Sequence, residues 1–155
     1  MNKSKIEELN LFLSSPFFLD MDFQKAIQIA KRFSKNKDHF KKGFRKIKLA
    51  IVSNFNIDFL IESLDFCLYQ RGLSVEIFVP KYGTMFTELI NSNSSIYKFK
   101  PDYILIWPTF RDIQKYHVSS NNEIAFWSKL WNVPIEKNIN IIQVLFDHPI
   151  YSFYQ

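Results

Sequence analysis

The sequence predicts an α/β protein, with an open, doubly wound and mainly parallel sheet in a three-layer arrangement, preceded by an N-terminal helical segment. Two observations predict this fold. From residue 47 onward, short apolar runs alternate with longer amphipathic stretches, which is typical of strands that alternate with helices. The runs are apolar almost without interruption, as expected for parallel strands in a sheet covered on both faces.

Residues 1–46 are predicted to be a helical segment that ends in a basic linker. Ser4 and Glu7 have the spacing of a capping box, in which the two side chains satisfy the first free N–H groups of a helix. Pro16 is expected to end this first helix. A second helix is expected over about 22–35, because its apolar residues repeat at helical spacing and predict a face packed on the main domain.

The stretch Lys35–Lys48 is strongly basic and contains interleaved aromatic residues. Residues 1–48 as a whole carry 12 Lys or Arg against 5 Asp or Glu, whereas the rest of the chain is slightly acidic. Nucleic-acid binding is one interpretation of such a stretch. We favour a solvated linker and expect no nucleic-acid partner, because one short basic patch is weak evidence for a partner.

Residues 47–155 are predicted to form the main α/β domain. The expected strands are Ile47–Ser53, Leu73–Val79, Tyr103–Trp107 and Ile139–Phe146. The expected helices cover about 58–70, with a cap at Asp58 and a left-handed helix end at Gly72, and about 84–90 and 122–131. The preceding helix over about 22–35 is expected to be capped by Asp20 or Asp22. Doubly wound domains usually have five or more strands, so we expect this domain to be truncated at its C-terminus, with an open sheet edge that needs cover.

A ligand pocket in such a sheet would lie at the carboxyl ends of the strands. The polar side chains expected there are Ser53, Asn54, Asn56, Tyr82, Thr109, Arg111, Asp147 and His148. The alternative is that these residues only form turns and helix caps.

Several chemistries are excluded or disfavoured by the residues present. The chain has only 3 Gly, so neither a GxGxxG fingerprint nor a P-loop occurs. With 3 widely spaced His and 1 Cys, no metal motif occurs, and we expect no cofactor for this chain. The single Cys67 precludes an internal disulfide and fits a cytoplasmic location. No apolar run approaches the roughly 18 residues that span a bilayer, so no membrane association is expected.

Nucleophilic catalysis has one candidate, Ser53, which follows the first predicted strand as in some esterases. However, Phe55 occupies the position that a nucleophile would take in a Gly-Asp-Ser turn, and no Asp-x-x-His occurs near the C-terminus. Cys67 lies in the middle of a predicted helix among apolar residues and is interpreted as core packing.

Four segments resemble one known family, the N-terminal domain of FkbH-like proteins. They are Ile51–Leu60, Gly72–Glu76 with Tyr82 and Gly83, Asn93–Asp102, and Ile141–Gln143 with Phe146 and Pro149. The third is the most specific, because a Ser, an apolar residue, Tyr and Phe precede Pro-Asp and a buried strand in that family. The resemblance covers most of residues 48–150.

The resemblance implies an esterase-like (SGNH-type, flavodoxin-like) α/β domain. In the family it precedes a haloacid-dehalogenase (HAD)-type domain with an Asp-x-Asp-x-Thr/Val loop and Mg. That second domain loads a three-carbon glyceryl unit from a phosphoglycerate onto an acyl carrier protein, in secondary-metabolite or surface-polysaccharide biosynthesis. No Asp-x-Asp-x-Thr/Val occurs here, so no catalytic residue is carried over.

The resemblance therefore predicts a non-catalytic module whose partners are a HAD-type catalytic domain or an acyl carrier protein, with Mg expected only in the HAD domain. Two alternatives stay open at this point. One is a stand-alone esterase or acyltransferase that uses Ser53 or Asp147 and His148. The other is one half of a nucleotide-sugar transferase, since such halves also show Pro-Asp before a buried strand.

Overall fold

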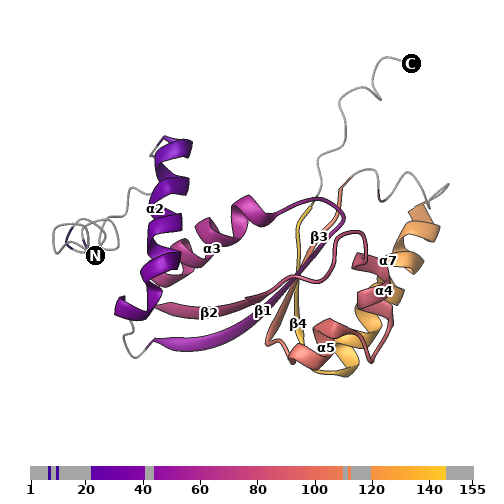
Figure 1. Cartoon of the computed structure of the whole chain (residues 1–155). Coiled ribbons are helices and arrows are strands. Elements are labelled where there is room, and N and C mark those ends of the chain that lie inside the picture. Colours follow the sequence, from indigo (N-terminus) through magenta and orange to yellow (C-terminus); the bar gives the residue numbers. More distant parts are fainter. Residues whose placement is uncertain are drawn as a thin grey trace, which may run out of the picture. The chain divides into compact units, whose positions relative to one another are not determined.

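The computed structural model describes residues 22–40, 44–109 and 120–145, together with Glu7, Asn10 and Asp112. They form an α/β fold with an open four-stranded parallel sheet in the order β2-β1-β3-β4 (Figure 1), which confirms the predicted fold class. The strands are β1 (Arg45–Ser53), β2 (Leu73–Phe78), β3 (Tyr103–Trp107) and β4 (Asn140–Gln143). The helices are α2 (Phe23–Asn36), α3 (Asp58–Gln70), α4 (Met85–Ile90), α5 (Ser95–Phe99) and α7 (Ser120–Glu136), with a 3-10 helix, η2 (Lys37–Phe40).

The described residues fall into two compact units, each with its own apolar core. The first unit lies within Met1–Ile47 and Ile57–Glu76 and contains α2, η2 and α3. The second lies within Lys48–Asn56 and Ile77–Gln155 and contains α4, α5, β3, α7 and β4. The boundaries cut through β1 and β2, so each of these strands contributes to both units.

Helix α2 forms where its capping residue and apolar stripe predict it. The Asp22 carboxylate accepts a hydrogen bond from the Lys25 backbone N–H at 3.2 Å, which satisfies one of the free donors at the helix start. The predicted cap at Asp58 is wrong, because Ile57 holds the cap position of α3 and Asp58 is the first helical residue. A carboxylate in that first turn still interacts favourably with the helix dipole.

The core of the first unit is a cluster of aromatic rings around Phe33. This ring is fully buried, and its centroid lies 5.8 Å from Phe40, 5.3 Å from Phe66 and 4.8 Å from Tyr69. Phe40 belongs to η2, within the stretch interpreted as a solvated linker, yet it is only 5% exposed. The chain after α2 is therefore partly folded into the core, because burial of an aromatic ring outweighs the polar character of its neighbours.

A lysine and an aspartate join η2 to α3 and β2 inside the first unit. The Lys37 ammonium donates hydrogen bonds to Asp65 Oδ1 at 2.6 Å, to Asp65 Oδ2 at 2.9 Å and to the Val75 carbonyl at 2.9 Å. The two side chains are 28% and 12% exposed. Lys37 belongs to the basic stretch of the sequence, but in the structure its ammonium bonds to Asp65 and Val75 of the first unit.

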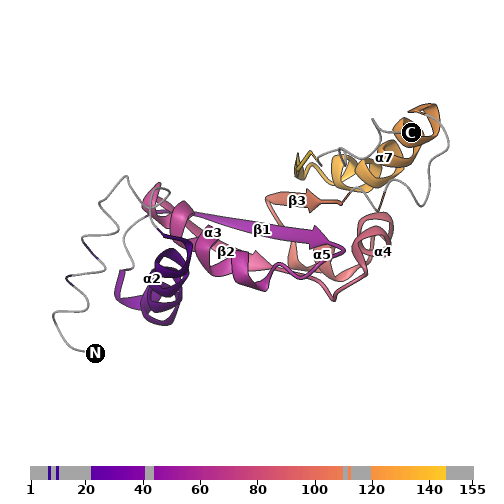
Figure 2. The same cartoon turned by 90° about the horizontal axis from the view of Figure 1, so that it is seen from above.

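The core of the second unit lies between the sheet and three helices. In the β1–β3 register, Ala50 pairs with Ile104 and Val52 with Ile106, and all four side chains are fully buried. They pack on residues of α4, α5 and α7, namely Met85, Leu89, Ile96, Tyr97, Trp127 and Leu130. These three helices lie together beside β3 and β4 in both views of the ribbon (Figures 1 and 2).

Helix α5 is absent from the predicted elements, although its residues carry the most specific part of the family resemblance. It has only five residues and ends at Lys100, whose φ of 55° is left-handed. Contacts with α4 stabilise it, because the Tyr97 hydroxyl donates to the Leu89 carbonyl at 2.7 Å and Glu88 accepts from the Ile96 N–H at 3.1 Å. Burial of Tyr97, and secondarily the charge of Glu88, raises the pKa of the Tyr97 phenol.

The other predicted elements are present in the described residues, and several of them differ from the prediction in length. Helix α7 extends past the predicted end at Trp131 and includes Pro134, which is buried. Strand β4 is Asn140–Gln143 instead of Ile139–Phe146, and β2 ends one residue earlier than predicted. Gly72 follows α3 with φ +80°, which confirms the predicted left-handed helix end. The predicted first helix falls outside the described residues apart from Glu7 and Asn10.

Candidate functional site

The parallel pairing of β1 and β3 places their carboxyl ends side by side, because Ser53 pairs with Trp107. The residues that follow these strands therefore share one edge of the sheet, which is the position where ligands of open α/β sheets bind. Asn54 directly follows β1, and Thr109 follows β3 after Pro108. Both belong to the predicted strand-end pocket.

A buried aspartate joins these two residues. Asp112 is 8% exposed and accepts from Asn54 Nδ2 at 2.7 Å, from the Thr109 backbone N–H at 2.7 Å and from the Thr109 hydroxyl at 3.0 Å. We call Asn54, Thr109 and Asp112 the strand-end cluster. Its carboxylate is held by three donors, so its structural role is to tie the two strand ends together.

Asp112 was not among the predicted site residues, although the sequence contains a signal for it. Thr109 and Asp112 have the spacing of a capping box, in which the later side chain accepts from the backbone N–H of the earlier residue. The bond to Asn54 spans 58 positions of the sequence and requires the sheet to be formed, so no local pattern predicts it.

The strand-end cluster leaves one acceptor open. The Oδ1 atom of Asn54 is buried and has no hydrogen-bond partner within the part of the chain that the structure describes. A buried amide oxygen without a donor costs about 1–3 kcal/mol, so this atom is the place in the cluster where a water or a polar ligand atom would be stabilised.

Ser53, the candidate nucleophile, is engaged in its own turn. It is 8% exposed, and its hydroxyl donates to the Phe55 carbonyl at 2.8 Å. The Phe55 ring packs edge-on against Trp107, with centroids 5.7 Å apart and planes at 88°. A nucleophilic serine needs an exposed oxygen whose proton is directed at a base. Here the proton is directed at a backbone carbonyl, which cannot act as that base.

The remaining predicted site residues do not join the strand-end cluster in the described structure. Asn56 is exposed, and Tyr82 is 70% exposed in the turn after β2. Arg111, Asp147 and His148 lie outside the described residues, so their predicted roles stay predictions.

Cys67 is partly buried in the first unit and packs against the aromatic cluster around Phe33, in agreement with the predicted packing role. Burial raises the pKa of the Cys67 thiol, and the nearby charge of Arg71 opposes this effect only in part. A raised thiol pKa keeps the less reactive protonated form at neutral pH.

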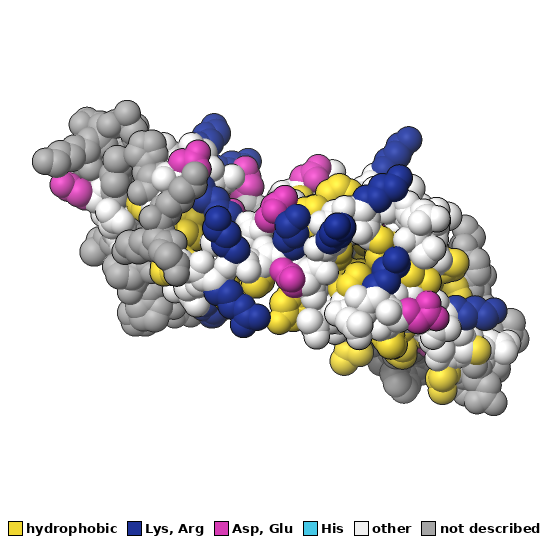
Figure 3. All heavy atoms as spheres, turned by 90° about the horizontal axis from the view of Figure 1, so that it is seen from below, with side chains coloured by type: hydrophobic (Ala, Val, Ile, Leu, Met, Phe, Trp, Pro, Cys, Tyr) yellow, Lys and Arg dark blue, Asp and Glu magenta, His cyan; other side chains and the backbone are white. Residues whose placement is uncertain are grey.

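Among the described residues, neither the charges on the face shown in Figure 3 nor the metal-ligating groups indicate a further site. On the face shown in Figure 3, lysine and arginine side chains are interspersed with aspartate and glutamate side chains. This pattern differs from the continuous basic stripe that is typical of nucleic-acid-binding surfaces. Within the described ranges, no group of three or more His, Cys, Asp or Glu could hold a metal ion. None of the helices described has the length and apolar character needed to cross a membrane.

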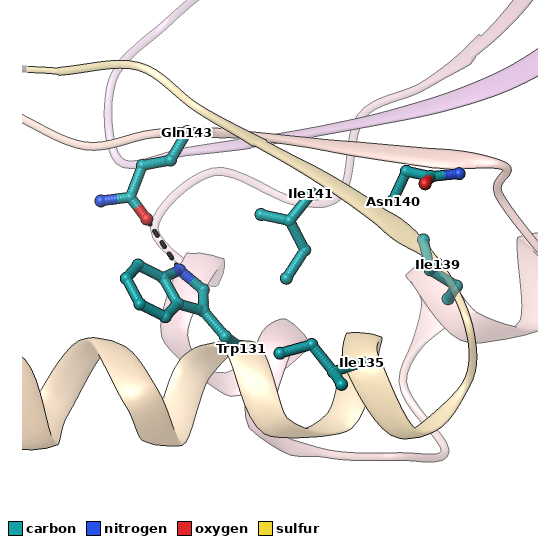
Figure 4. Close-up of a pocket in the computed structure, with 6 residues that line it drawn as sticks. All are labelled: Trp131, Ile135, Ile139, Asn140, Ile141 and Gln143. Carbon is teal, nitrogen blue, oxygen red and sulfur yellow. Dashed lines mark hydrogen bonds between the residues drawn. The ribbon is translucent and has the colours of Figure 1, made fainter.

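A second candidate site is a pocket between α7 and β4, with a volume of about 500 Å³. Its lining residues are Trp131, Ile135, Ile139, Asn140, Ile141 and Gln143. Ile141 and Gln143 point from β4 toward the helix, where the Trp131 indole N–H donates to Gln143 Oε1 at 2.8 Å (Figure 4). The pocket is mainly apolar and lies beside the last strand of the sheet. No sequence pattern pointed to it, because it requires the packing of a helix on a strand.

The comparisons with known proteins decide the family. Residues 48–147 match the family model described as FkbH, N-terminal domain. The chain belongs to the FkbH family. The match includes both the strand-end cluster and the α7–β4 pocket, so both are features of the FkbH N-terminal domain of this chain.

A solved structure has the same fold. It is the crystal structure of the N-terminal part of the protein BF1531 from Bacteroides fragilis, containing a phosphatase domain complexed with Mg, with a TM-score of 0.65 and 16% identity. The match covers 83% of this chain and 35% of that chain, so this chain spans about a third of the length of its structural neighbour. No curated protein matches the sequence.

Proposed function

We propose that this chain is a non-catalytic docking module of an FkbH-like protein, and that it serves a HAD-type catalytic part. The activity of the whole protein would then be the loading of a glyceryl unit, derived from a phosphoglycerate, onto an acyl carrier protein. Secondary-metabolite or surface-polysaccharide biosynthesis would use this product. Mg would belong to the catalytic part.

The observation that carries this proposal is the match of residues 48–147 to the FkbH N-terminal domain. Two facts support the non-catalytic role. The sequence contains no Asp-x-Asp-x-Thr/Val loop. At the strand ends, where an active site of this fold would lie, the Ser53 hydroxyl and the Asp112 carboxylate bond to neighbouring groups of the same unit. The phosphatase domain of the structural neighbour is consistent with a HAD-type partner.

The test begins with the DNA next to this coding sequence. A reading frame that encodes Asp-x-Asp-x-Thr/Val, either adjacent or continuous with it, supplies the partner. The two polypeptides are then purified together, and glyceryl loading of a carrier protein is measured with and without this chain. We expect co-purification and slower loading when the chain is omitted. Loading that is unaffected by the chain, with no complex formed, contradicts the proposal.

A stand-alone esterase is the second candidate, since Ser53 lies at the end of β1 where esterases of this kind place their nucleophile. The test is hydrolysis of a p-nitrophenyl ester by the purified chain and by its Ser53→Ala variant. The bond from Ser53 to the Phe55 carbonyl leads us to expect no difference between the two proteins. Turnover that is lost only in Ser53→Ala would establish the esterase instead.

A further inference from the structure

Strand β4 is an edge strand with an open side. Within the part of the chain that the structure describes, it pairs only with β3. The backbone N–H of Asn140 donates to the Asp102 carbonyl at 3.2 Å, and that of Val144 donates to the Ile106 carbonyl at 2.9 Å. Backbone groups alternate in direction along a strand, so the N–H and C=O groups of Ile141 and Gln143 point away from β3.

Among the described residues, neither charge nor proline protects this edge. Natural sheets protect their edges with short edge strands, with lysine or other charged side chains, with proline or with a covering element. The sequence from Asn138 to Phe146 contains neither a charged residue nor a proline. By contrast, β2 at the other end of the sheet carries the exposed Glu76, and the Lys37 ammonium bonds to its Val75 carbonyl.

Exposed apolar side chains surround this edge. Ile142 is 48% exposed, and Leu145, directly after the strand, is 87% exposed. Ile135 on α7 lines the α7–β4 pocket and is 60% exposed. An open strand edge beside an apolar pocket is the arrangement used in strand addition, where main-chain hydrogen bonds supply affinity and a pocket accepts alternate side chains.

We infer that the β4 edge is the docking surface for the HAD-type catalytic part, which adds an extended, uncharged segment to β4 and places an apolar side chain in the α7–β4 pocket. The inference rests on the proposed function. The occupant is argued from the comparisons, because the matched family model describes an N-terminal domain and the longer structural neighbour contains a phosphatase domain.

The test uses a paired set of charge variants of the full chain. The edge variant is Ile135→Lys with Leu145→Lys, which puts charges beside the pocket and the strand without touching a buried side chain. The control variant is Ile90→Lys with Ile124→Lys, since these isoleucines are 55% and 65% exposed and do not line the pocket. Binding of each protein to the polypeptide that carries Asp-x-Asp-x-Thr/Val is measured by calorimetry, and folding is checked by circular dichroism.

We expect the edge variant to bind at least about 100-fold more weakly than the wild type, and the control variant to bind within about threefold of it. Hydrogen exchange supplies a second readout, because partner binding should slow exchange of the Ile141 and Gln143 amides. Equal binding by both variants, with unchanged exchange at these amides, overturns the inference and leaves the proposed function standing. Absence of binding by the wild type overturns both. Self-association of the wild type that only the edge variant abolishes would assign the edge to a second copy of this chain.

Discussion

Replacing Asp65 with asparagine should destabilise the first unit by removing the charge partner of Lys37 while keeping the side-chain shape. The Lys37 ammonium makes three hydrogen bonds, two to Asp65 and one to the Val75 carbonyl. Removal of one partner of a fully buried ion pair costs about 3–5 kcal/mol. The Lys37 side chain is 28% exposed, and its bond to Val75 persists. We therefore expect a loss of about 1–3 kcal/mol in the free energy of unfolding.

A double-mutant cycle separates this ion pair from other effects of the substitutions. Urea unfolding is followed by circular dichroism for Asp65→Asn, Lys37→Met and the double variant. The double variant should lose less stability than the sum of the single losses, with a coupling of about 1–2 kcal/mol. A control cycle pairs Asp65→Asn with Lys35→Met, because Lys35 is an exposed cation of α2. That cycle should be additive within about 0.5 kcal/mol. Additivity in the Lys37 cycle as well would refute the structural argument.

Four further predictions concern the core, the turn after α3, the Cys67 thiol and the basic stretch. Phe33→Ala should cost about 3–5 kcal/mol in unfolding free energy, measured in urea, because it leaves a cavity among buried rings; a loss below about 1 kcal/mol would contradict the packing. Gly72→Ala should cost about 1 kcal/mol because φ is +80°, although no atom lies within 4 Å of the added methyl group; an unchanged urea midpoint would contradict this. Burial raises the pKa of Cys67, so iodoacetamide should label this thiol more slowly in the folded chain than in urea at pH 8, and equal rates would contradict it. Neutralising the exposed Arg45 and Lys46 should weaken binding to an acidic carrier protein and reduce its salt dependence, with an unchanged dissociation constant as the contrary outcome.

The sequence predicts the sheet well because the strands are short, apolar and bounded by turn residues. The predicted Tyr103–Trp107 coincides with β3, since Pro108 directly follows the strand. The elements that sequence reasoning misjudged depend on tertiary packing. Helix α5 is too short to show a helical period. It is held by two hydrogen bonds to α4, in which the Tyr97 hydroxyl donates to the Leu89 carbonyl and the Ile96 N–H donates to Glu88. Helix α7 continues through Pro134 because that residue is buried in the packed unit.

In the candidate site as well, the sequence predicts one part and tertiary packing determines the other. The sequence places polar residues at the strand ends, and pairing of β1 with β3 brings Asn54 and Thr109 onto one carboxylate. That carboxylate, Asp112, lies in the segment that follows the third predicted strand, and its Thr-x-x-Asp spacing is that of a capping box. The hydrogen bonds within this cluster could not be predicted, since bonds across the sheet depend on strand register and on side-chain rotamers.

Two regions of the second unit, the strand ends and the β4 edge, differ in the hydrogen-bonding groups that they leave available. The general rule for open α/β sheets places ligands at the strand ends. Among the described residues at the strand ends, the Ser53 hydroxyl bonds within its own turn, Asn54 and Thr109 bond to Asp112, and the amide oxygen of Asn54 has no partner. At the β4 edge, a row of outward backbone groups lies beside an apolar pocket and exposed isoleucine and leucine side chains. Backbone groups in such a row form several hydrogen bonds at once with an extended segment, whereas a single amide oxygen orders one ligand atom. The β4 edge is therefore suited to bind an extended polypeptide segment, as the proposed docking module requires.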